Sequence, residues 1–239
     1  MPNITKTLGQ HMLVDRRVLA RIVEAAKIGN DETVLEAGTG QGVLTAELCK
    51  AAKSIVSYEV DKKLYLQARE RLQFQNLDLV NADLFKTRNL NFDVFASNLP
   101  YSRSRDAFEW LAVQKFKRAI VMVQEEFAEK LAAGPGAKNY RAISALATHC
   151  FAIEKLFRVG RQSFEPPPKV ESTVLRIIPI NTVTKETVKS LNLLFSKRNK
   201  KASTVAARAG VKTDFGSKRI DQLVPRDLIR MAESNVRPI

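Results

Sequence analysis

Strand-like and helix-like segments alternate along the first two-thirds of this chain, and the alternation limits the possible folds more than any other feature. Short β-prone runs occupy residues 33–37, 54–58, 77–81, 92–97 and 119–123. Between several of them lie segments whose apolar residues have helical spacing, such as residues 43–52 and 62–74. Repeated alternation predicts an α/β fold with a mostly parallel sheet and helices on both faces.

The last third of the chain has a different pattern. Two strands are expected to flank the proline-rich stretch Phe164–Pro168, and beyond Pro179 the spacing of apolar residues is helical throughout. Residues 184–239 contain 13 Lys/Arg and 5 Asp/Glu, a net charge of +8. We therefore expect two domains: an α/β domain over residues 1–181 and a basic helical domain over residues 182–239.

The charge and composition of the chain limit its partners. Lys and Arg outnumber Asp and Glu by 39 to 25, a formal net charge of +14, which favours a polyanion, with nucleic acid as the first candidate. Two cysteines and two histidines are too few for a disulfide framework and make a zinc site improbable, so no metal is expected. The chain has no run of 18 apolar residues, and its start lacks the apolar core of a signal peptide. These features predict a cytoplasmic protein with no membrane partner.

A glycine-rich turn follows the first predicted strand and precedes a helix. Residues 36–42 read Glu-Ala-Gly-Thr-Gly-Gln-Gly, and glycines such as Gly38 and Gly40 allow a sharp turn and a close approach to a ligand. The turn lacks the Gly-Lys-Ser/Thr of a phosphate-binding loop, and its third glycine comes one place too early for the dinucleotide fingerprint. By itself such a turn is also compatible with a simple tight turn that binds nothing.

Acidic residues follow the next two predicted strands. Glu59 ends the second strand, 21 residues after Gly38, a sequence separation that suits contact with a ribose diol. Asp83 follows the third strand, where its carboxylate could accept a hydrogen bond from an adenine amine. Because the carboxyl ends of parallel strands meet at one edge of a sheet, these residues should lie together. The set predicts a site for a nucleoside that needs no phosphate, such as S-adenosyl-L-methionine.

The segment Asn98-Leu99-Pro100-Tyr101 follows the fourth strand and should face the same edge. The Asn98 side-chain oxygen and the Leu99 carbonyl can each accept one N–H of an exocyclic amine, which would aim the nitrogen lone pair at a methyl donor. Pro100 stiffens the turn, and the Tyr101 ring can stack on an extruded base. The alternative is a purely structural role, as a strand-end turn with a buried tyrosine.

These residues together resemble the family of small-subunit ribosomal RNA adenine dimethyltransferases, in its archaeal form. The resemblance extends over nearly the whole chain and includes Leu8–Leu13, residues 36–45, Asn98–Tyr101, Gln124–Tyr140, Phe164–Ser172, Phe195–Arg198 and Lys218–Leu223. It implies a Rossmann-like class I methyltransferase domain with a mostly parallel seven-stranded sheet, followed by a small helical domain. It also implies transfer of methyl groups from S-adenosyl-L-methionine to two adjacent adenines near the 3′ end of small-subunit rRNA, with a role in ribosome biogenesis.

The resemblance assigns roles to individual residues. It implies cofactor contacts at His11, Leu13, Gly38, Glu59, Asp83 and Asn98, and it places Phe164 over the target base opposite Tyr101. Three positions depart from the family pattern: His11 and Met12 replace the usual Asn and Phe, Ser102–Arg105 replaces an apolar and hydroxyl stretch, and Arg141 stands where glycine is common.

Positive charges indicate where RNA would bind. Arg103 and Arg105 lie next to the predicted target-base segment, and Lys197, Arg198, Lys200 and Lys201 form a basic cluster in the tail, although most such charge runs are only solvated faces. We expect this surface to hold the small ribosomal subunit, and we expect the enzyme to be a monomer. Two alternatives stay open: a large-subunit rRNA adenine methylase, and a catalytically idle RNA-binding assembly factor on the same fold.

Overall fold

The computed structural model describes residues 11–88, 90–98, 100–208 and 215–234. Its contacts divide the chain into two compact units. The sheet unit contains the chain up to Ala107, Lys115–Glu125 and Ile153–Ile178, and the helical unit contains Phe108–Gln114, Glu126–Ala152 and the chain from Pro179 on. In the part of the chain that is described, no helix is both long and apolar enough to cross a membrane.

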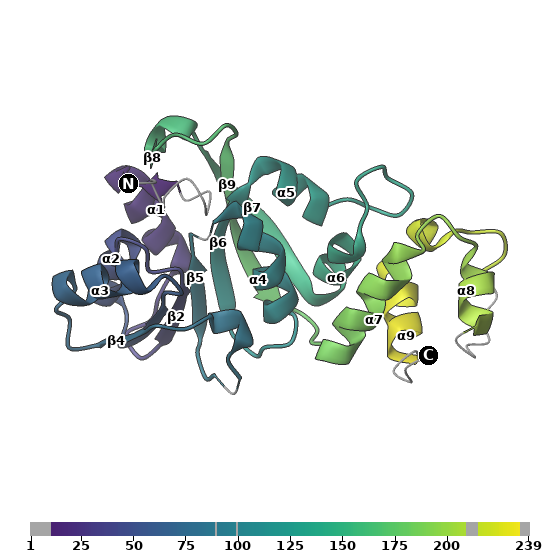
Figure 1. Ribbon diagram of the computed structural model, residues 1–239, viewed down its shortest axis with the longest axis horizontal. Coiled ribbons are helices and arrows are strands. Elements are labelled where there is room, and N and C mark those ends of the chain that lie inside the picture. Colours follow the sequence, from purple (N-terminus) through teal and green to yellow (C-terminus); the bar gives the residue numbers. More distant parts are fainter. Residues whose placement is uncertain (1–10, 89, 99, 209–214, 235–239) are drawn as a thin grey trace. The chain divides into compact units, whose positions relative to one another are not determined.

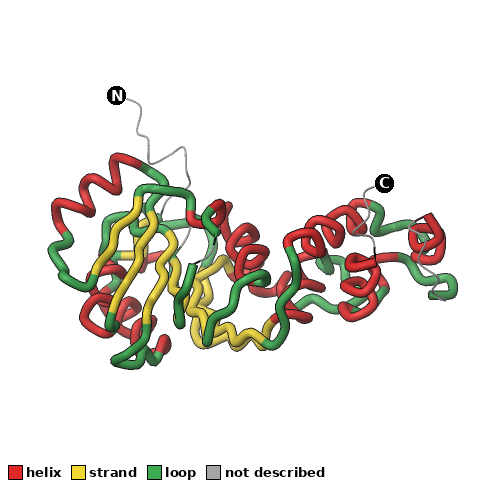
Figure 2. Tube along the Cα trace, turned by 90° about the horizontal axis from the view of Figure 1, so that it is seen from below, coloured by secondary structure: helices red, strands yellow, loops and turns green. Residues whose placement is uncertain are grey.

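A seven-stranded sheet forms the centre of the sheet unit, with the strand order β4-β3-β2-β5-β6-β9-β7 (Figures 1 and 2). Its strands are β2 (Thr33–Ala37), β3 (Ser54–Tyr58), β4 (Leu77–Val80), β5 (Val94–Ser97), β6 (Arg118–Gln124), β7 (Phe151–Val159) and β9 (Ser172–Pro179). The pairs β3–β4, β2–β3, β2–β5 and β5–β6 are parallel, and β9 is antiparallel to β6. This arrangement confirms the prediction of a mostly parallel seven-stranded sheet with the class I methyltransferase pattern.

The helices of the sheet unit are α1 (Arg16–Ala26), α2 (Val43–Ala51) and α3 (Lys62–Arg71), and α4 (Ser104–Leu111) extends from this unit into the helical one. The Asp15 carboxylate caps α1 by accepting from the backbone N–H of Arg17 at 2.9 Å and of Val18 at 3.3 Å. The apolar stripe of α1, which includes Leu19 and Ile22, is buried in a core cluster together with residues of α2 and the central strands. Burial of this stripe fixes α1 and α2 on one face of the sheet.

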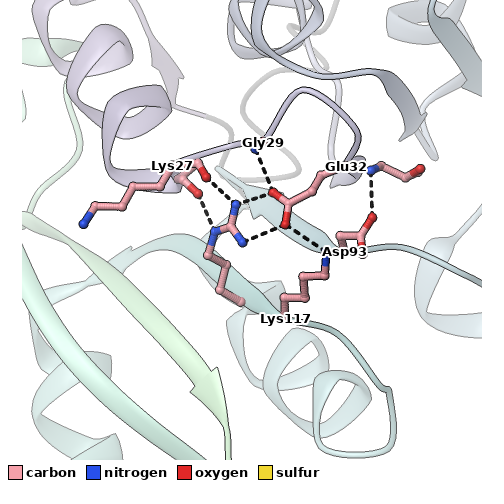
Figure 3. Close-up of polar contacts among 8 residues, drawn as sticks. Lys27, Gly29, Glu32, Asp93 and Lys117 are labelled. Atoms are coloured by element: carbon pink, nitrogen blue, oxygen red, sulfur yellow. Dashed lines mark hydrogen bonds and ion pairs between the residues drawn. The ribbon is translucent and has the colours of Figure 1, made fainter.

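A network of ion pairs ties together the amino ends of β2, β5 and β6 (Figure 3). Arg118 forms a two-pronged ion pair with Glu32 and donates from Nε to the Ala26 carbonyl at 2.6 Å. Lys117 bridges Glu32 at 3.2 Å and Asp93 at 3.1 Å. The Arg118 guanidinium holds the pKa of Glu32 at about 2, so this carboxylate stays ionised and paired. The edge opposite this network is the one where the strands end.

A second, two-stranded sheet lies beside that carboxyl edge. It pairs β1 (Met12–Leu13) with β8 (Phe164–Glu165) in antiparallel fashion, so that Leu13 lies opposite Phe164. The backbone N–H of Val14 also donates to the Ser163 carbonyl at 2.9 Å, next to the short 3-10 helix η4 (Arg161–Ser163). These contacts bring the start of the described chain to the proline-rich segment.

The helical unit is built around three helices that pack on one another: α6 (Ala142–Cys150), α7 (Lys185–Ser196) and α9 (Pro225–Ser234). It also contains most of α5 (Glu125–Leu131), α8 (Ala202–Arg208) and the 3-10 helix η5 (Ile220–Gln222). Tyr140 is fully buried, donates its hydroxyl to the Leu223 carbonyl at 3.1 Å and packs edge-on against the Phe195 ring. Tyr140, one of the residues that carry the family resemblance, therefore anchors the tail of the chain to the rest of this unit.

Candidate active site at the carboxyl ends of the strands

A cavity of about 180 Å³ opens at the carboxyl ends of β2, β3, β4 and β5, within the sheet unit. The loops after these four strands supply most of its wall, and β1 with His11 before it, Leu19 of α1 and the start of α2 supply the rest. Most of the predicted site residues line it: His11, Leu13, Gly38, Gly40, Glu59, Asp83, Asn98, Pro100, Tyr101 and Arg103. The structure therefore brings these residues together, as the parallel topology predicts.

The glycine-rich loop lines the cavity with Gly38 and Gly40 beside Thr39 and Gln41. Gly38 and Gly40 have positive φ values of 82° and 56°, which glycine adopts without strain. The N–H of Gly38 donates to the Tyr58 carbonyl at 2.8 Å, which ties the loop to the end of β3. A Cβ at Gly40 would lie 3.6 Å from the Met12 sulfur, which is ordinary contact, so backbone conformation is the stronger reason for glycine there.

Glu59 is held rigidly at the end of β3. Its side chain is buried, Oε2 accepts from the Gly40 N–H at 2.8 Å, and Oε1 accepts from the Asp61 N–H at 2.8 Å. Each carboxylate oxygen can accept a second hydrogen bond. The carboxylate is therefore oriented by the protein and still able to accept from two neighbouring hydroxyls.

Asp83 follows β4 and caps the 3-10 helix η2 (Leu84–Lys86), with Oδ1 accepting from the Phe85 N–H at 3.1 Å. Nη2 of Arg103 lies 3.0 Å from Oδ1 and 3.2 Å from Oδ2 of this carboxylate. Arg103 belongs to the 3-10 helix η3 (Tyr101–Arg103), so the ion pair joins the loop after β4 to the segment that follows Asn98. The Arg103 guanidinium, for which the sequence predicts a contact with RNA, contacts a carboxylate in the cavity wall.

The Tyr101 side chain is half-buried and fixed at its hydroxyl. Its Oη lies 2.7 Å from the Ser172 Oγ, and burial raises the pKa of Tyr101, which keeps the phenol neutral. The His11 ring lies 5.9 Å from the Tyr101 ring, centroid to centroid. His11 Nδ1 is 2.7 Å from the Pro166 carbonyl oxygen, and since a carbonyl only accepts, Nδ1 carries a proton. Histidine at this departure from the family pattern thus links the cavity to the proline-rich segment.

Of the residues predicted at the reacting centre, Phe164 is not among those that line the cavity, and Leu99 falls outside the described chain. Phe164, expected over the target base, is 3% exposed and packs in the core cluster with Leu13 and Leu19. Leu99 lies outside the described residues, as do Leu8–Gln10 of the N-terminal motif. The role of the Leu99 carbonyl stays a prediction.

The basic cluster of the tail is concentrated by backbone pairing within the helical unit. The Ile220 N–H donates to the Lys200 carbonyl at 3.1 Å, and the Ala202 N–H donates to the Lys218 carbonyl at 2.8 Å. Residues 197–201 therefore run beside residues 218–221. Their basic side chains are exposed apart from Arg198, which is partly buried, and the group comprises Lys197, Arg198, Lys200, Lys201, Lys218 and Arg219.

Several cavity residues were missed by sequence reasoning. Val60 and Phe85 line the cavity, and each directly follows or nearly follows a predicted acidic contact. Val60 lines the cavity and is 63% exposed, so its apolar side chain is accessible to a ligand. The available signal was the repeated order of an acid and then an apolar residue after two successive strands. Ser172, the partner of Tyr101, gave no separate signal.

Glu36 of the glycine-rich segment points into the protein. It is 1% exposed, and Oε2 accepts from the Thr45 and Ser57 hydroxyls, each at 2.6 Å. Among the described residues, its Oε1 has no hydrogen-bond partner. Burial raises the pKa of Glu36 to about 7, with the Glu59 charge adding to the effect and the two hydroxyls opposing it. Ser57 also lies 2.6 Å from the Thr39 hydroxyl, so Glu36 is connected to the loop that lines the cavity.

Comparison with known proteins agrees with this geometry. Residues 1–223 match the family model described as ribosomal RNA adenine dimethylase. The chain is 34% identical over 239 residues to the ribosomal RNA small subunit methyltransferase A of Thermotoga maritima, covering 96% of this chain and 85% of the relative. It is 33% identical over 196 residues to the probable enzyme of the same name from Pyrococcus abyssi, covering 82% and 73% of the two chains.

Solved structures give the same picture. A dimethyladenosine transferase from Plasmodium falciparum superposes with a TM-score of 0.75 at 28% identity, covering 92% of this chain and 96% of that one. The 23S rRNA methyltransferase ErmE superposes with a TM-score of 0.64 at 25% identity, covering 95% and 100% of the two chains. With the family model matched over nearly the whole length and the motif residues gathered around one cavity, the chain belongs to the ribosomal RNA adenine dimethylase family.

Proposed function

We propose that this protein transfers methyl groups from S-adenosyl-L-methionine to the exocyclic amines of two adjacent adenines near the 3′ end of small-subunit rRNA. One observation carries the proposal. Glu59, Asp83 and Asn98, from the ends of three different strands, line the same cavity as the Gly38–Gly40 loop. Family membership and the names of the relatives favour rRNA as the substrate.

The residues of the cavity fit S-adenosyl-L-methionine. The ordered Glu59 carboxylate suits the two ribose hydroxyls, and Asp83 suits the adenine amine. Val60 and Phe85 offer apolar contact to the adenine ring, while His11 and Leu13 close the side formed by β1. When bound, the cofactor would supply an electrophilic methyl group on a sulfonium. The loop at Gly38 and Gly40 admits a ligand against the backbone because neither residue carries a side chain.

The loop after β5 would prepare the target amine. The Asn98 oxygen would accept one N–H of the adenine amine, which favours a pyramidal nitrogen with its lone pair directed at the methyl group. The Tyr101 ring would stack on the extruded base, at about 1–3 kcal/mol for such a contact. The proton can leave the nitrogen after methyl transfer, so the chain needs no general base before the reaction. The neutral Tyr101 phenol agrees with a stacking role.

The helical unit would hold the RNA backbone. Its basic residues at 197–201 and 218–219 lie on two segments whose backbones are hydrogen-bonded to each other, and this pairing concentrates positive charge on one surface. Phosphate contacts of this kind position a nucleic acid without specifying its sequence. Arg105, beside the cavity loop, is proposed as a further contact near the target base. We propose that the partner is the small ribosomal subunit and that the enzyme acts as a cytoplasmic monomer.

The test uses small ribosomal subunits from a strain that lacks dimethyladenosine in this rRNA. The protein and methyl-labelled S-adenosyl-L-methionine are added, and the products are mapped by mass spectrometry of rRNA fragments. Two adjacent dimethyladenosines near the 3′ end are expected from the wild type. Asn98→Ala should keep cofactor affinity within a few fold and lose transfer, because it removes an acceptor at the reacting amine. Label in large-subunit rRNA alone, or none in either RNA, would overturn the proposal.

A further inference from the structure

Arg103 occupies an unusual place between the two halves of the cavity. Its backbone lies in the 3-10 helix η3, two residues after Tyr101, while its guanidinium reaches the loop after β4. Both Arg103 and Asp83 line the cavity, and their side chains are 35% and 16% exposed. The residue therefore links the predicted target-base segment to the predicted adenine end.

The guanidinium is fixed on three sides. Nη2 contacts both oxygens of Asp83, Nε lies 3.1 Å from Asp106 Oδ2, and the group sits over the Phe85 ring at 5.1 Å. Two carboxylates and an aromatic face hold a planar cation far better than one surface partner does. Since Asp83 and Asp106 together compensate its charge, Arg103 acts toward the cavity wall rather than toward an RNA phosphate.

The contact with Arg103 also limits what Asp83 can accept. A carboxylate offers about four acceptor directions. Oδ1 uses two of its directions for the Phe85 N–H and Arg103, and Oδ2 uses one for Arg103. Lys86 Nζ, at 3.9 Å from Oδ2 and 84% exposed, is beyond hydrogen-bond distance. The remaining direction on Oδ2 matches the single hydrogen bond that an exocyclic amine needs.

We propose that Arg103 is a positioning residue that orients Asp83 for recognition of the 6-amino group of the cofactor adenine. This assignment rests on the proposed function, because it needs a cavity that binds an adenine nucleoside. It differs from RNA contact, the role expected of Arg103 from its charge. Rotation of the Asp83 carboxylate is blocked at both oxygens while Arg103 is in place, so the preference for an amine donor depends on a residue of the target-base segment.

The test compares two ligands in calorimetry: S-adenosylhomocysteine, whose 6-amino group donates, and S-inosylhomocysteine, whose 6-oxo group accepts. Wild type should prefer the amino ligand. Arg103→Leu should bind S-adenosylhomocysteine about 5- to 20-fold more weakly and lose most of the preference, as should Asp83→Asn. The double variant should bind no more weakly than Asp83→Asn alone, because both changes remove the same interaction. Arg103→Lys should restore part of the preference.

Lys86→Met is the matched control, since it removes a positive charge near Asp83 without touching the hydrogen-bonded pair. Its affinities for both ligands should equal those of wild type. Thermal unfolding of Arg103→Leu checks that the fold is retained, and the partial rescue by Arg103→Lys separates positioning from a general loss of structure. If Arg103→Leu bound S-adenosylhomocysteine as tightly as wild type or more tightly, with the preference intact, the assignment would be wrong. Failure of wild type to bind either ligand would instead overturn the proposed function, and the assignment with it.

Discussion

Replacing Glu36 by glutamine should change the stability of the protein in a way that depends on pH. The Glu36 carboxyl is buried at the end of β2, with a pKa of about 7 against an ordinary value of 4.5. Glutamine has the same shape, and its oxygen can still accept from the Thr45 and Ser57 hydroxyls. Because glutamine cannot ionise, Glu36→Gln removes the pH-dependent cost of burying a charge, while its amide nitrogen takes the place of Oε1, which has no hydrogen-bond partner among the described residues, at a cost that does not depend on pH.

The size and sign of the effect follow from the pKa. The native state binds this proton more tightly than the unfolded state, so the stability of the wild type falls as pH rises from about 4.5 to about 7. The two pKa values differ by about 2.5, and at about 1.4 kcal/mol for a difference of one this corresponds to about 3 to 4 kcal/mol. Above pH 7 the wild type carries this whole cost. From acid to mildly alkaline solution, the free energy of unfolding of the variant should therefore rise by about 3 to 4 kcal/mol relative to that of the wild type.

Urea unfolding followed by far-UV circular dichroism, at about pH 5 and about pH 8, measures the change. Relative to wild type, Glu36→Gln should be more stable at about pH 8 than at about pH 5, by about 2 to 3 kcal/mol. Glu47→Gln is the matched control on α2, since the Glu47 side chain is 42% exposed and pairs with Lys50, and such surface pairs contribute less than about 1 kcal/mol. If the difference between Glu36→Gln and wild type were equal at both pH values, burial would not hold the proton on Glu36, and the reasoning would fail.

Three further predictions concern the site and the tail. Glu59→Gln should weaken binding of S-adenosyl-L-methionine by about 1.5–3 kcal/mol in calorimetry, because the ribose loses a charged acceptor; unchanged affinity would contradict the ribose contact. Tyr101→Phe should keep most of the methylation rate, since stacking needs only the ring, whereas Tyr101→Ala should lose it; equal losses would assign the role to the hydroxyl that meets Ser172. The last change reverses four basic residues of the tail to Glu: Lys197, Arg198, Lys200 and Lys201. It should weaken binding to the small subunit and lower the slope of log binding constant against log salt concentration by roughly 0.7–0.9 for each lost phosphate contact, with cofactor binding unchanged. A slope equal to that of the wild type would mean that the cluster is only a solvated face.

The sequence carries enough information to predict the sheet and most of the cavity. Strand–helix alternation determines which edge of a parallel sheet receives the loops, so Gly38, Glu59, Asp83 and Asn98 could be grouped before any coordinates were known. The buried face of α1 was likewise predictable, because its apolar stripe repeats at helical spacing. These features depend on periodicity and on the order of elements along the chain.

Other features depend on the direction of single side chains or on contacts between distant segments. The pairing of Met12–Leu13 with Phe164–Glu165 involves strands of only two residues, too short to leave a periodic signal. A charged residue such as Arg103 looks the same in sequence whether it faces solvent or Asp83. The segment 126–152 belongs to the helical unit although its neighbours in the chain belong to the sheet unit, and only long-range packing determines that.

Two glutamates four residues apart show how one strand serves both stability and the site. Glu32, just before β2, is paired with Arg118, and its pKa is lowered to about 2, so it adds stability above about pH 4.5 that is lost as the pH falls toward 2. Glu36, within β2, has the opposite shift and lowers stability as the pH rises toward 7. The stabilising carboxylate lies at the amino edge, among ion pairs (Figure 3). Glu36, the destabilising carboxylate, connects through Ser57 to Thr39 in the cavity loop. The loss of stability therefore lies at the edge where the chemistry is proposed to occur.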